Sequence, residues 1–371
     1  MSRGILAKML VLLAAMTLIL GACDRGDDGG GGEGNGNGEE AAQAAGGELL
    51  QEVIDRGTLR CGVNNTVPGF GFDVGGGEID GFDIDFCRAF AAALLGDAEA
   101  IELIPIDADN RFIALQNGDY DVLVRNTTHT TSRDGAESVA FTHVNFYDGQ
   151  AMMVPADAGI TQIDQMNNAA VCVTTGTTTE LNLADYFQER GLEFEAIAFE
   201  DNTQLQRAFL SGRCDSWTSD RSQLAGIRSA WPQNEGGPES LVILEEVMSK
   251  EPLAPGTLDT EIALHDALNA VVNGVILAEE LGVNSNNVDR MANNPPNGQI
   301  AALLGAPVPD PTGAEAVPID NGLGIPNDFM VGVLKAVGNY EEIFNRHLGP
   351  NSPLGLERGI NALWTEGGIQ Y

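Results

Sequence analysis

The chain has 371 residues and a formal net charge of -35, from 19 Lys plus Arg against 54 Asp plus Glu. This balance excludes a nucleic-acid binder that relies on a basic surface, because such a protein neutralises phosphates with Lys and Arg. It also argues against docking on anionic lipids through a polybasic patch. Hydrophobic residues make up 43% of the chain, enough for ordinary globular cores, and the length suggests about two or three domains.

The first 22 residues have the features of an export signal. Two positive residues precede an apolar run, Met9–Leu20. This run is shorter than the roughly 20 residues that span a bilayer, so it predicts a signal peptide at residues 1–22. The sequence LGAC at 20–23 resembles a bacterial lipobox, which implies cleavage before Cys23 and acylation of Cys23 with fatty acids such as palmitate. The alternative is a plain signal peptide followed by an incidental cysteine.

Residues 23–47 are predicted to form the lipidated cysteine and a disordered acidic, glycine-rich tether. The stretch Asp24–Gly47 contains ten glycines in 24 residues, and its largest apolar side chain is Ala. Such a stretch buries too little apolar surface to offset the entropy lost on ordering. We therefore expect the protein to be exported and anchored to the cell membrane by lipid, facing the periplasm or the cell exterior.

Four further cysteines, Cys61, Cys87, Cys172 and Cys214, fit an exported protein. Four cysteines allow three pairings. We expect Cys61 to pair with Cys87 and Cys172 with Cys214, because each pair stays within one half of the chain. Free buried thiols are the alternative. The chain has no CxxC motif and only four histidines, which argues against a zinc site, and the sequence indicates no metal and no cofactor.

From about Glu48 the chain alternates strand and helix patterns. The first run predicts strands at 58–63, 101–106 and 121–124, with helices at 81–95 and 111–117. The second run predicts strands at 170–173, 196–199 and 215–218, with helices near 180–190 and 202–211. Each run therefore predicts a parallel sheet covered by helices, and the fold class is α/β.

Two extended segments, 149–155 and 245–256, are predicted to cross between the two sheets. The predicted organisation is lobe 1 at 48–153, lobe 2 at 154–250, and a return to lobe 1 with a C-terminal helical extension at 251–371. In open α/β sheets ligands bind beyond the carboxyl ends of the strands. We therefore expect a binding cleft between the lobes that closes about a hinge.

Polar groups suited to a zwitterion follow the predicted strands. Arg133 lies in the hydroxyl-rich segment 125–134 (RNTTHTTSRD), where its guanidinium and the Thr128 hydroxyl could hold a carboxylate. The segment 174–179 (TTGTTT) opens a helix whose first N–H groups form an anion site. Asp220 follows the third strand of the second run and could pair with an ammonium group. Taken singly, each feature could instead be a surface ion pair, a polar turn or a solvated acid.

Longer stretches of the sequence resemble a known family. They include CGVNNTVPGF, RFIALQNGDYDVLVRNTTHTTSRD, VCVTTGTTTELNLADYF and SGRCDSWTSD. These stretches resemble the family 3 extracellular solute-binding proteins of polar amino-acid ABC transporters and, more narrowly, the general L-amino-acid-binding periplasmic proteins. The resemblance implies a two-lobed, type II periplasmic-binding-protein fold with two parallel-rich sheets and a two-stranded hinge. It also implies a monomeric, non-enzymatic receptor that binds an L-amino acid and delivers it to an ABC permease and its ATPase.

The resemblance also implies roles for single residues. Arg133 and Thr128 match positions that hold the α-carboxylate of the ligand, Thr178 matches a backbone contact to the same group, and Asp220 matches the acid that takes the α-ammonium. Further positions expected to line the cleft are Asn64, Val67, Asn126 and Thr174. Arg111 and Arg125 fit the subfamily pattern without an assigned role. His129 stands where the subfamily usually has Trp, which predicts an altered side-chain preference.

Two other functions remain open from the sequence. A dehydratase-like enzyme on the same fold, acting on a prephenate-like acid, would need a general acid in the cleft. His129 and Asp220 are the candidates for that role. A sensory or adaptor protein would instead pass ligand occupancy to a receptor.

Overall fold

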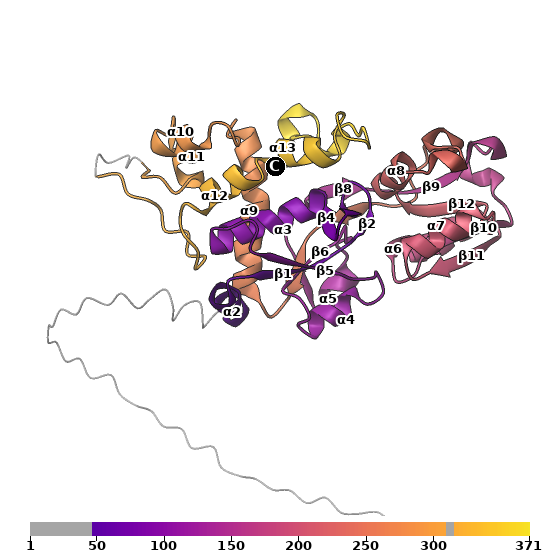
Figure 1. Cartoon of the computed structure of the whole chain (residues 1–371), viewed down its shortest axis with the longest axis horizontal. Coiled ribbons are helices and arrows are strands. Elements are labelled where there is room, and N and C mark those ends of the chain that lie inside the picture. The colour runs from indigo at the N-terminus through magenta and orange to yellow at the C-terminus, as the bar shows by residue number, and fades with distance from the viewer. Residues whose placement is uncertain (1–46, 309–314) are drawn as a thin grey trace, which may run out of the picture. The chain divides into compact units, whose positions relative to one another are not determined.

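The computed structural model describes residues 47–308 and 315–371. The predicted signal peptide, Cys23 and the tether up to residue 46 lie outside the described residues. The chain forms two five-stranded sheets and a two-stranded sheet whose strands connect them along the chain. Figure 1 shows the two larger sheets with their flanking helices. The α/β fold class predicted from the sequence is confirmed.

The first sheet has the strand order β5-β1-β6-β15-β7. Its strands are β1 (Leu59–Val63), β5 (Ile101–Pro105), β6 (Val122–Val124), β7 (Val139–Phe141) and β15 (Gly256–Leu258). Strands β5, β1 and β6 are parallel, whereas β15 returns antiparallel between β6 and β7. The helices of this part are α2 (Glu48–Arg56), α3 (Phe82–Leu95), α4 (Arg111–Gln116) and α5 (Thr131–Gly135). The sequence therefore predicted the three parallel strands but not the antiparallel pair.

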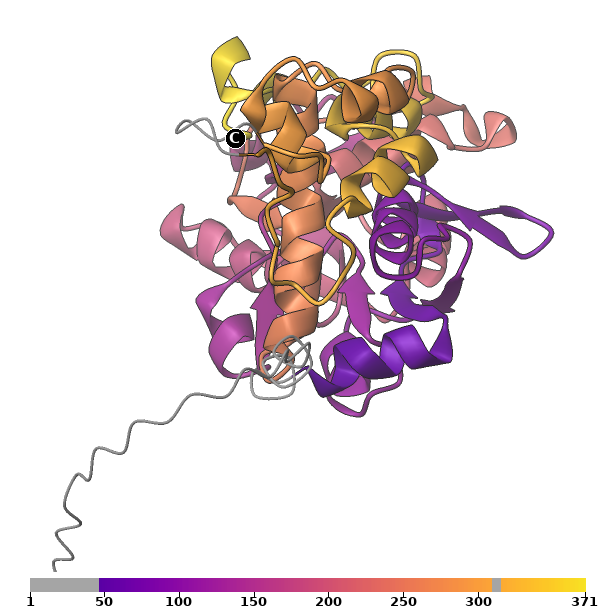
Figure 2. The same cartoon turned by 90° about the vertical axis from the view of Figure 1, so that its left-hand side faces the viewer.

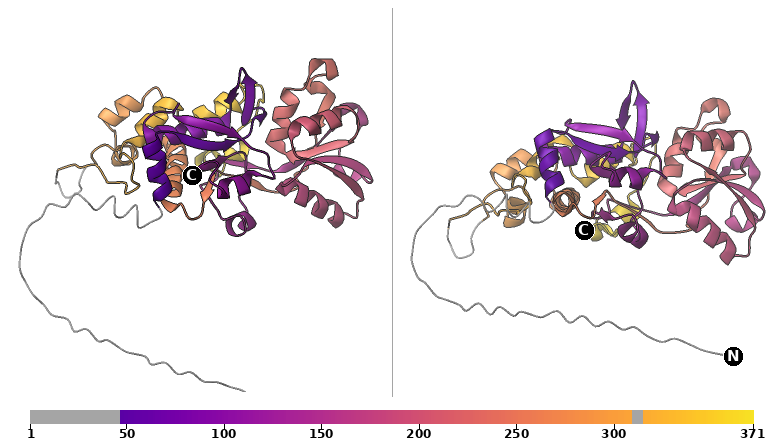
Figure 3. Two further views of the ribbon diagram at one scale, coloured as in Figure 1. Left: turned by 60° about the horizontal axis from the view of Figure 1, so that its bottom comes forward. Right: turned by 90° about the horizontal axis from the view of Figure 1, so that it is seen from below.

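The second sheet has the order β11-β10-β12-β9-β13. Its strands are β9 (Gln150–Pro155), β10 (Ala169–Thr174), β11 (Phe194–Phe199), β12 (Ser216–Asp220) and β13 (Leu241–Ile243). Helices α6 (Thr178–Glu189), α7 (Asn202–Leu210) and α8 (Arg221–Ser229) pack against it, and Figure 3 shows helices on both of its faces. Strands β10, β11 and β12 are parallel, and β9 and β13 are antiparallel to their neighbours.

A two-stranded hinge joins the two sheets. Strand β8 (Phe146–Asp148) pairs antiparallel with β14 (Glu251–Leu253), with Asp148 opposite Glu251. The predicted boundary at 153/154 falls inside β9, which belongs entirely to the second sheet. The first crossing therefore lies a few residues earlier than the sequence predicted, because the apolar GQAMMVP segment is a central strand and not a connector.

A small sheet of β2 (Thr66–Val67), β3 (Gly71–Gly75) and β4 (Glu78–Asp80) was not expected from the sequence. Short 3₁₀ helices occur at Ala156–Ala158, Ile163–Gln165, Gln233–Glu235, Pro238–Ser240, Gly359–Asn361 and Trp364–Glu366. These pieces follow turn-forming residues and carry no periodic apolar pattern, which explains why periodicity missed them.

The C-terminal part packs back on the first sheet, as predicted. Its helices are α9 (Ile262–Glu280), α10 (Val288–Asn293), α11 (Gly298–Leu303), α12 (Phe329–Ala336) and α13 (Tyr340–His347). Among the described residues α9 alone is long and apolar enough to span a membrane by length and composition. Yet Leu264, Val271 and Val275 are fully buried against α3, α12 and α13, so α9, the long helix in Figure 2, is a core helix.

One of the two predicted disulfides is present. Cys172 in β10 is bonded to Cys214, with a Cα–Cα distance of 5.6 Å. Cys61 and Cys87 are free buried thiols, so the structure contradicts the predicted pair. Burial raises the pKa of the Cys87 thiol well above its usual range.

Candidate functional site

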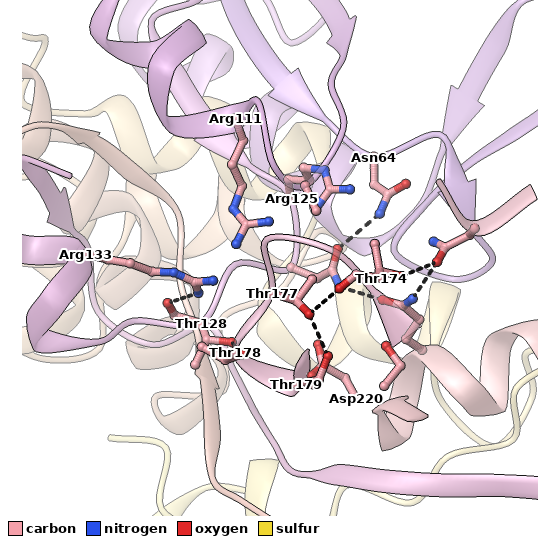
Figure 4. Close-up of a pocket in the computed structure, with 15 residues that line it drawn as sticks. Asn64, Arg111, Arg125, Thr128, Arg133, Thr174, Thr177, Thr178, Thr179 and Asp220 are labelled. Carbon is pink, nitrogen blue, oxygen red and sulfur yellow. Dashed lines mark hydrogen bonds between the residues drawn. The ribbon is translucent and has the colours of Figure 1, made fainter. Parts of the chain in front are cut away.

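A polar cavity lies between the strand ends of the two sheets (Figure 4). It encloses about 400 Å³, including space open to solvent. Seven of the eight predicted ligand-binding residues line it, namely Asn64, Asn126, Thr128, Arg133, Thr174, Thr178 and Asp220. The fold therefore brings these distant segments together, while their individual roles stay predictions.

Val67 is the exception. It lies in β2, is fully buried and packs in the main hydrophobic core rather than against the cavity. The expectation that Val67 lines the cleft is therefore wrong. The unforeseen β2–β3 pairing explains the error, since Val67 is paired with Gly71 and turned inward.

The strand ends place the polar groups at one edge of each sheet. Asn64 directly follows β1, and Arg125 follows β6. In the second sheet Thr174 ends β10 and Asp220 ends β12. Parallel strands end at the same edge of a sheet, so side chains distant in sequence converge there.

The first turn of α6 forms part of the wall. Thr177 caps the helix, accepting a hydrogen bond from the Glu180 backbone N–H at 3.1 Å. The following residues, Thr178 and Thr179, line the cavity. The unpaired N–H groups and partial positive charge of a helix N-terminus favour an anion at this position.

Three guanidinium groups, those of Arg111, Arg125 and Arg133, line the cavity and point into it (Figure 4). None of them forms an ion pair with a carboxylate of the described residues. Each donates to a backbone carbonyl instead. The acceptors are Gly176 O at 3.2 Å for Arg111, Ile106 O at 2.7 Å for Arg125, and Thr128 O at 2.6 Å for Arg133.

Burial and repulsion between the arginines disfavour the charged forms of these side chains. Burial, followed by the charge of Arg133, lowers the pKa of Arg111 well below its usual range. Burial lowers the pKa of Arg133 to about 10. The Nε of Arg111 is buried without a hydrogen-bond partner. Since buried donors are costly to leave unpaired, the cavity is built to receive an anion.

Asp220 is an acid whose ionised form is disfavoured. Its carboxyl is buried, and burial, followed by the charges of Asp148 and Glu251, raises its pKa well above the usual range. A cation placed beside it would relieve this effect by favouring the ionised form. The cavity thus has a cationic wall and an isolated acid, which is the arrangement that an α-amino acid head group requires.

The Thr128 hydroxyl is not a free donor, contrary to the expectation from the sequence. It donates to Glu251 Oε2 at 2.6 Å. A threonine hydroxyl has a single proton, so its oxygen can only accept a hydrogen bond on the cavity side. Sequence reasoning missed Glu251, because one acid among 54 carries no signal of its own.

The two halves touch across the cavity. Arg111 reaches Gly176 on the opposite side, and Asn126 Nδ2 donates to Gln223 Oε1 at 3.1 Å. Asn202 Nδ2 donates to Thr66 Oγ1 at 3.2 Å. These contacts show the halves in a closed arrangement around the cavity.

Sequence reasoning also missed four lining residues, namely Ala108, Asn202, Ser219 and Gln223, whereas Thr177 and Thr179 belong to the predicted anion-binding segment 174–179. Most of them directly follow a strand or open a helix at the same sheet edge, and this position is the signal that could have found them. His129 is not among the lining residues. Its ring stacks on Phe141 and its Nε2 lies 2.9 Å from Asp134 Oδ2.

The cluster Asp80, Asp85 and His347 offers the ligand types of a metal site. Its central acid already pairs with Arg88 at 3.0 Å, with His347 at 2.7 Å and with Arg346. Two guanidinium groups on one carboxylate disfavour a metal cation there, so we assign this cluster to the packing of α13 on α3.

The model of the bacterial extracellular solute-binding proteins, family 3, matches residues 59–350. The chain belongs to this family. It is 41% identical over 330 residues to the general L-amino acid-binding periplasmic protein AapJ of Rhizobium johnstonii, covering 89% of this chain and 93% of that protein. It is 38% identical to the glutamate/glutamine/aspartate/asparagine-binding protein BztA of Rhodobacter capsulatus, covering 89% of this chain and 94% of that protein.

Solved structures agree with this family 3 assignment. A periplasmic binding protein of an ABC transporter from Brucella ovis, with glutathione bound, shares 41% identity and a TM-score of 0.80. The match covers 87% of this chain and 97% of that one. A cysteine-binding protein from Campylobacter jejuni, at 22% identity and a TM-score of 0.55 over 62% of this chain and 88% of that one, shares the fold alone.

The closed arrangement requires glycine at position 176. Gly176 has φ +71°, and a Cβ there would lie 2.7 Å from the Asp109 Cα on the opposite side. Gly176→Ala should therefore hinder closure and weaken binding of the amino-acid ligand by roughly tenfold. Titration calorimetry measures the affinity.

Gly191→Ala is the matched control. Gly191 has φ +65°, and a Cβ added there would meet nothing within 4 Å, so this variant carries the same backbone strain without the clash. Equal affinities for the two variants would show that the 176–109 contact does not limit closure.

Proposed function

We propose that this family 3 protein binds an L-amino acid whose side chain carries a second acid group, and delivers it to the permease of an ABC importer. The observation that carries the proposal is the set of three guanidinium groups that line the cavity, Arg111, Arg125 and Arg133. Two of them are buried and that of Arg125 is half-buried, and none forms an ion pair with a carboxylate in the described part of the chain.

Charge balance distinguishes ligand classes. Three guanidinium groups face a single lining carboxylate, Asp220. A neutral zwitterion would pair its carboxylate with one guanidinium and its ammonium with Asp220, which leaves two buried cations unpaired. An uncompensated buried charge costs on the order of several kcal/mol. A second carboxylate on the ligand pairs with these cations and removes much of that cost.

The position of each group suggests how the ligand lies. Arg133 and the first turn of α6 take the α-carboxylate, and Asp220 takes the α-ammonium, as the sequence predicted. The Thr128 oxygen, which can only accept, suits the ammonium too. Arg111 and Arg125 then face the side chain and hold the second acid group through charge-assisted hydrogen bonds.

The strongly negative chain does not contradict an anionic ligand. Screening at physiological ionic strength limits exposed charges to a range of about 8 Å. The cavity has low dielectric walls and buried cations at contact distance, so the local field decides the preference.

The relatives include binders of this ligand class. The name of BztA includes glutamate and aspartate together with their amides, glutamine and asparagine. Glutathione, which is bound in the structure from Brucella ovis, carries one ammonium and two carboxylates. Glutamate, aspartate and glutathione share an α-amino acid head and a second acid.

Binding and closure are coupled in this proposal. Arg133 belongs to one half, whereas Asp220 and α6 belong to the other, so a ligand touches both halves only when they close. A ligand with such contacts shifts the population toward the closed form, which the permease then recognises. A catalytic role has less support, because His129, one of the two candidate acids, lies outside the cavity lining.

We also propose that the protein is held at the membrane by lipid on Cys23, on the strength of the LGAC sequence at 20–23. Cys23→Ser should move the protein from the membrane fraction to the soluble fraction and abolish incorporation of labelled palmitate. Retention in the membrane fraction would argue for a different anchor.

The charge argument predicts a preference for L-glutamate over L-glutamine of at least about tenfold in affinity, since glutamine leaves two cations unpaired. Arg111→Gln should reduce this preference, mainly through weaker glutamate binding. Titration calorimetry with both ligands gives the ratio. Arg207→Gln, which changes an exposed arginine of α7, should leave the ratio unchanged, and equal wild-type affinities for the two ligands would reject the proposed class.

Binding should also release protons. Burial raises the pKa of Asp220 in the free protein, so below that pKa the carboxyl is protonated. The ligand ammonium favours the ionised form and lowers the pKa, so the proton leaves on binding and affinity falls as the pH is lowered. Calorimetry over a series of pH values, in buffers of different ionisation enthalpy, should detect this release.

Asp220→Asn should abolish the proton release and weaken binding. Asp185→Asn, which changes an exposed acid of α6, should retain the wild-type release. Proton uptake by the wild-type protein would contradict the assignment of Asp220 to the ammonium.

A further inference from the structure

Glu251 begins the hinge strand β14 and is 1% exposed. It forms no ion pair with any residue that the structure describes. Four hydrogen bonds satisfy its carboxylate instead. Oε2 accepts from Thr128 Oγ1 at 2.6 Å and from Thr178 Oγ1 at 2.7 Å, while Oε1 accepts from Asn182 Nδ2 at 2.8 Å and from Ser249 Oγ.

The donors come from three parts of the fold. Thr128 follows β6 of the first sheet, Thr178 and Asn182 lie in the first two turns of α6, and Ser249 precedes β14 in the hinge. A single carboxylate therefore ties the hinge to both walls of the cavity. It does so from behind the threonines, since Glu251 itself does not line the cavity.

One side of this connection is fixed by the backbone. The His129 N–H donates to Pro252 O at 2.8 Å, and the Ala254 N–H donates to Thr127 O at 3.0 Å. The segment around Thr128 therefore runs along β14 whatever the position of the other half. The start of α6 also contacts the chain beside the hinge, because Gln150 Nε2 donates to Thr179 O at 2.8 Å. The bonds from Thr178 and Asn182 connect α6 to β14 itself.

The same bonds fix the direction of two hydroxyl protons. Thr128 and Thr178 each direct their single proton to Glu251 Oε2, and their oxygens lie 3.3 Å apart. Both oxygens then present lone pairs to the cavity. Without Glu251 these hydroxyls would be free to rotate, and a bound ammonium would have to order them.

We propose that Glu251 is a positioning residue for ligand binding. Its carboxylate latches the start of α6 to the hinge and to Thr128, and it fixes Thr128 and Thr178 as hydrogen-bond acceptors before the ligand arrives. This role rests on the proposed function, because the ligand that profits from the fixed hydroxyls is the amino acid head group.

Substitution of Glu251 should weaken binding in a graded way. Glu251→Ala removes all four acceptor contacts and should reduce the affinity for L-glutamate at least about tenfold, mainly through faster dissociation. Glu251→Gln keeps one accepting oxygen and should recover part of the loss, to within about threefold of wild type. Stopped-flow fluorescence and calorimetry measure the rates and affinities.

A double-mutant cycle separates the latch from a general loss of stability. Asn182 contacts Glu251 but does not line the cavity. If the latch exists, Glu251→Ala combined with Asn182→Ala should cost clearly less affinity than the product of the single effects, because both changes break the same connection. Independent effects would reject the latch.

Glu245→Ala is the matched control. Glu245 lies in the same connecting segment, its side chain is 93% exposed, and it pairs with the half-buried Arg221 at 3.1 Å, so its removal should leave affinity within about twofold of wild type. An unchanged or tighter affinity in Glu251→Ala, with a folded protein by circular dichroism, would overturn the proposal.

A separate result would show that the proposed ligand class is wrong while leaving the role of Glu251 to be tested. If the wild-type protein binds no L-glutamate, that class is rejected. Hydrogen exchange of the ligand-free protein then decides on Glu251, because Glu251→Ala and Asn182→Ala should each speed exchange of the first α6 amides while Glu245→Ala should not. Equal exchange in all three variants and wild type would reject the latch.

Discussion

The rest of the structure depends on the three positively charged side chains that share one cavity. Arg111, Arg125 and Arg133 come from separate segments of one half. Burial lowers the pKa of all three, and repulsion by a neighbouring arginine adds to this effect at Arg111 and Arg133. The fold can retain these guanidinium groups only if other interactions offset the cost of removing them from water. Hydrogen bonds to backbone carbonyls offset part of this cost, and a bound anion can offset the rest. Unpaired cations thus destabilise the closed form of the empty protein. An anionic ligand that pairs with them removes this cost and thereby stabilises the closed form.

The hinge shows how this coupling reaches the rest of the molecule. Asp148 and Glu251 face each other on the two crossing strands; Glu251 is buried and Asp148 is half-buried. Ser222 and the Gly149 N–H hydrogen-bond to Asp148, while Glu251 binds the walls of the cavity. Their charges in turn act on Asp220. The charges in this region therefore depend on one another. They are the arginines of the cavity wall, the two acids of the hinge and the Asp220 carboxylate.

Much of this could be predicted from the sequence because parallel strands end at a common edge. Arg133, Asp220 and the α6 threonines were found from their positions after predicted strands, and the cavity brings them together. What could not be predicted depends on contacts between distant segments. Val67 turns inward through a pairing of short strands that have no periodic signal, and Cys61 and Cys87 are buried thiols without a disulfide. The Thr128 proton is committed to an acid 123 residues away, and no local pattern reveals such a partner.

The order of segments along the chain has a consequence for how the molecule is assembled. The second sheet and its disulfide are built entirely between β8 and β14, so they need nothing that follows. The larger core, by contrast, combines α3 with α9, α12 and α13, whose residues emerge last during synthesis and translocation. The inserted half can fold while the outer half still lacks its closing strand and helices. Any chaperone that accompanies this chain should therefore find its exposed apolar surface on α3 and β1, the earliest segments made.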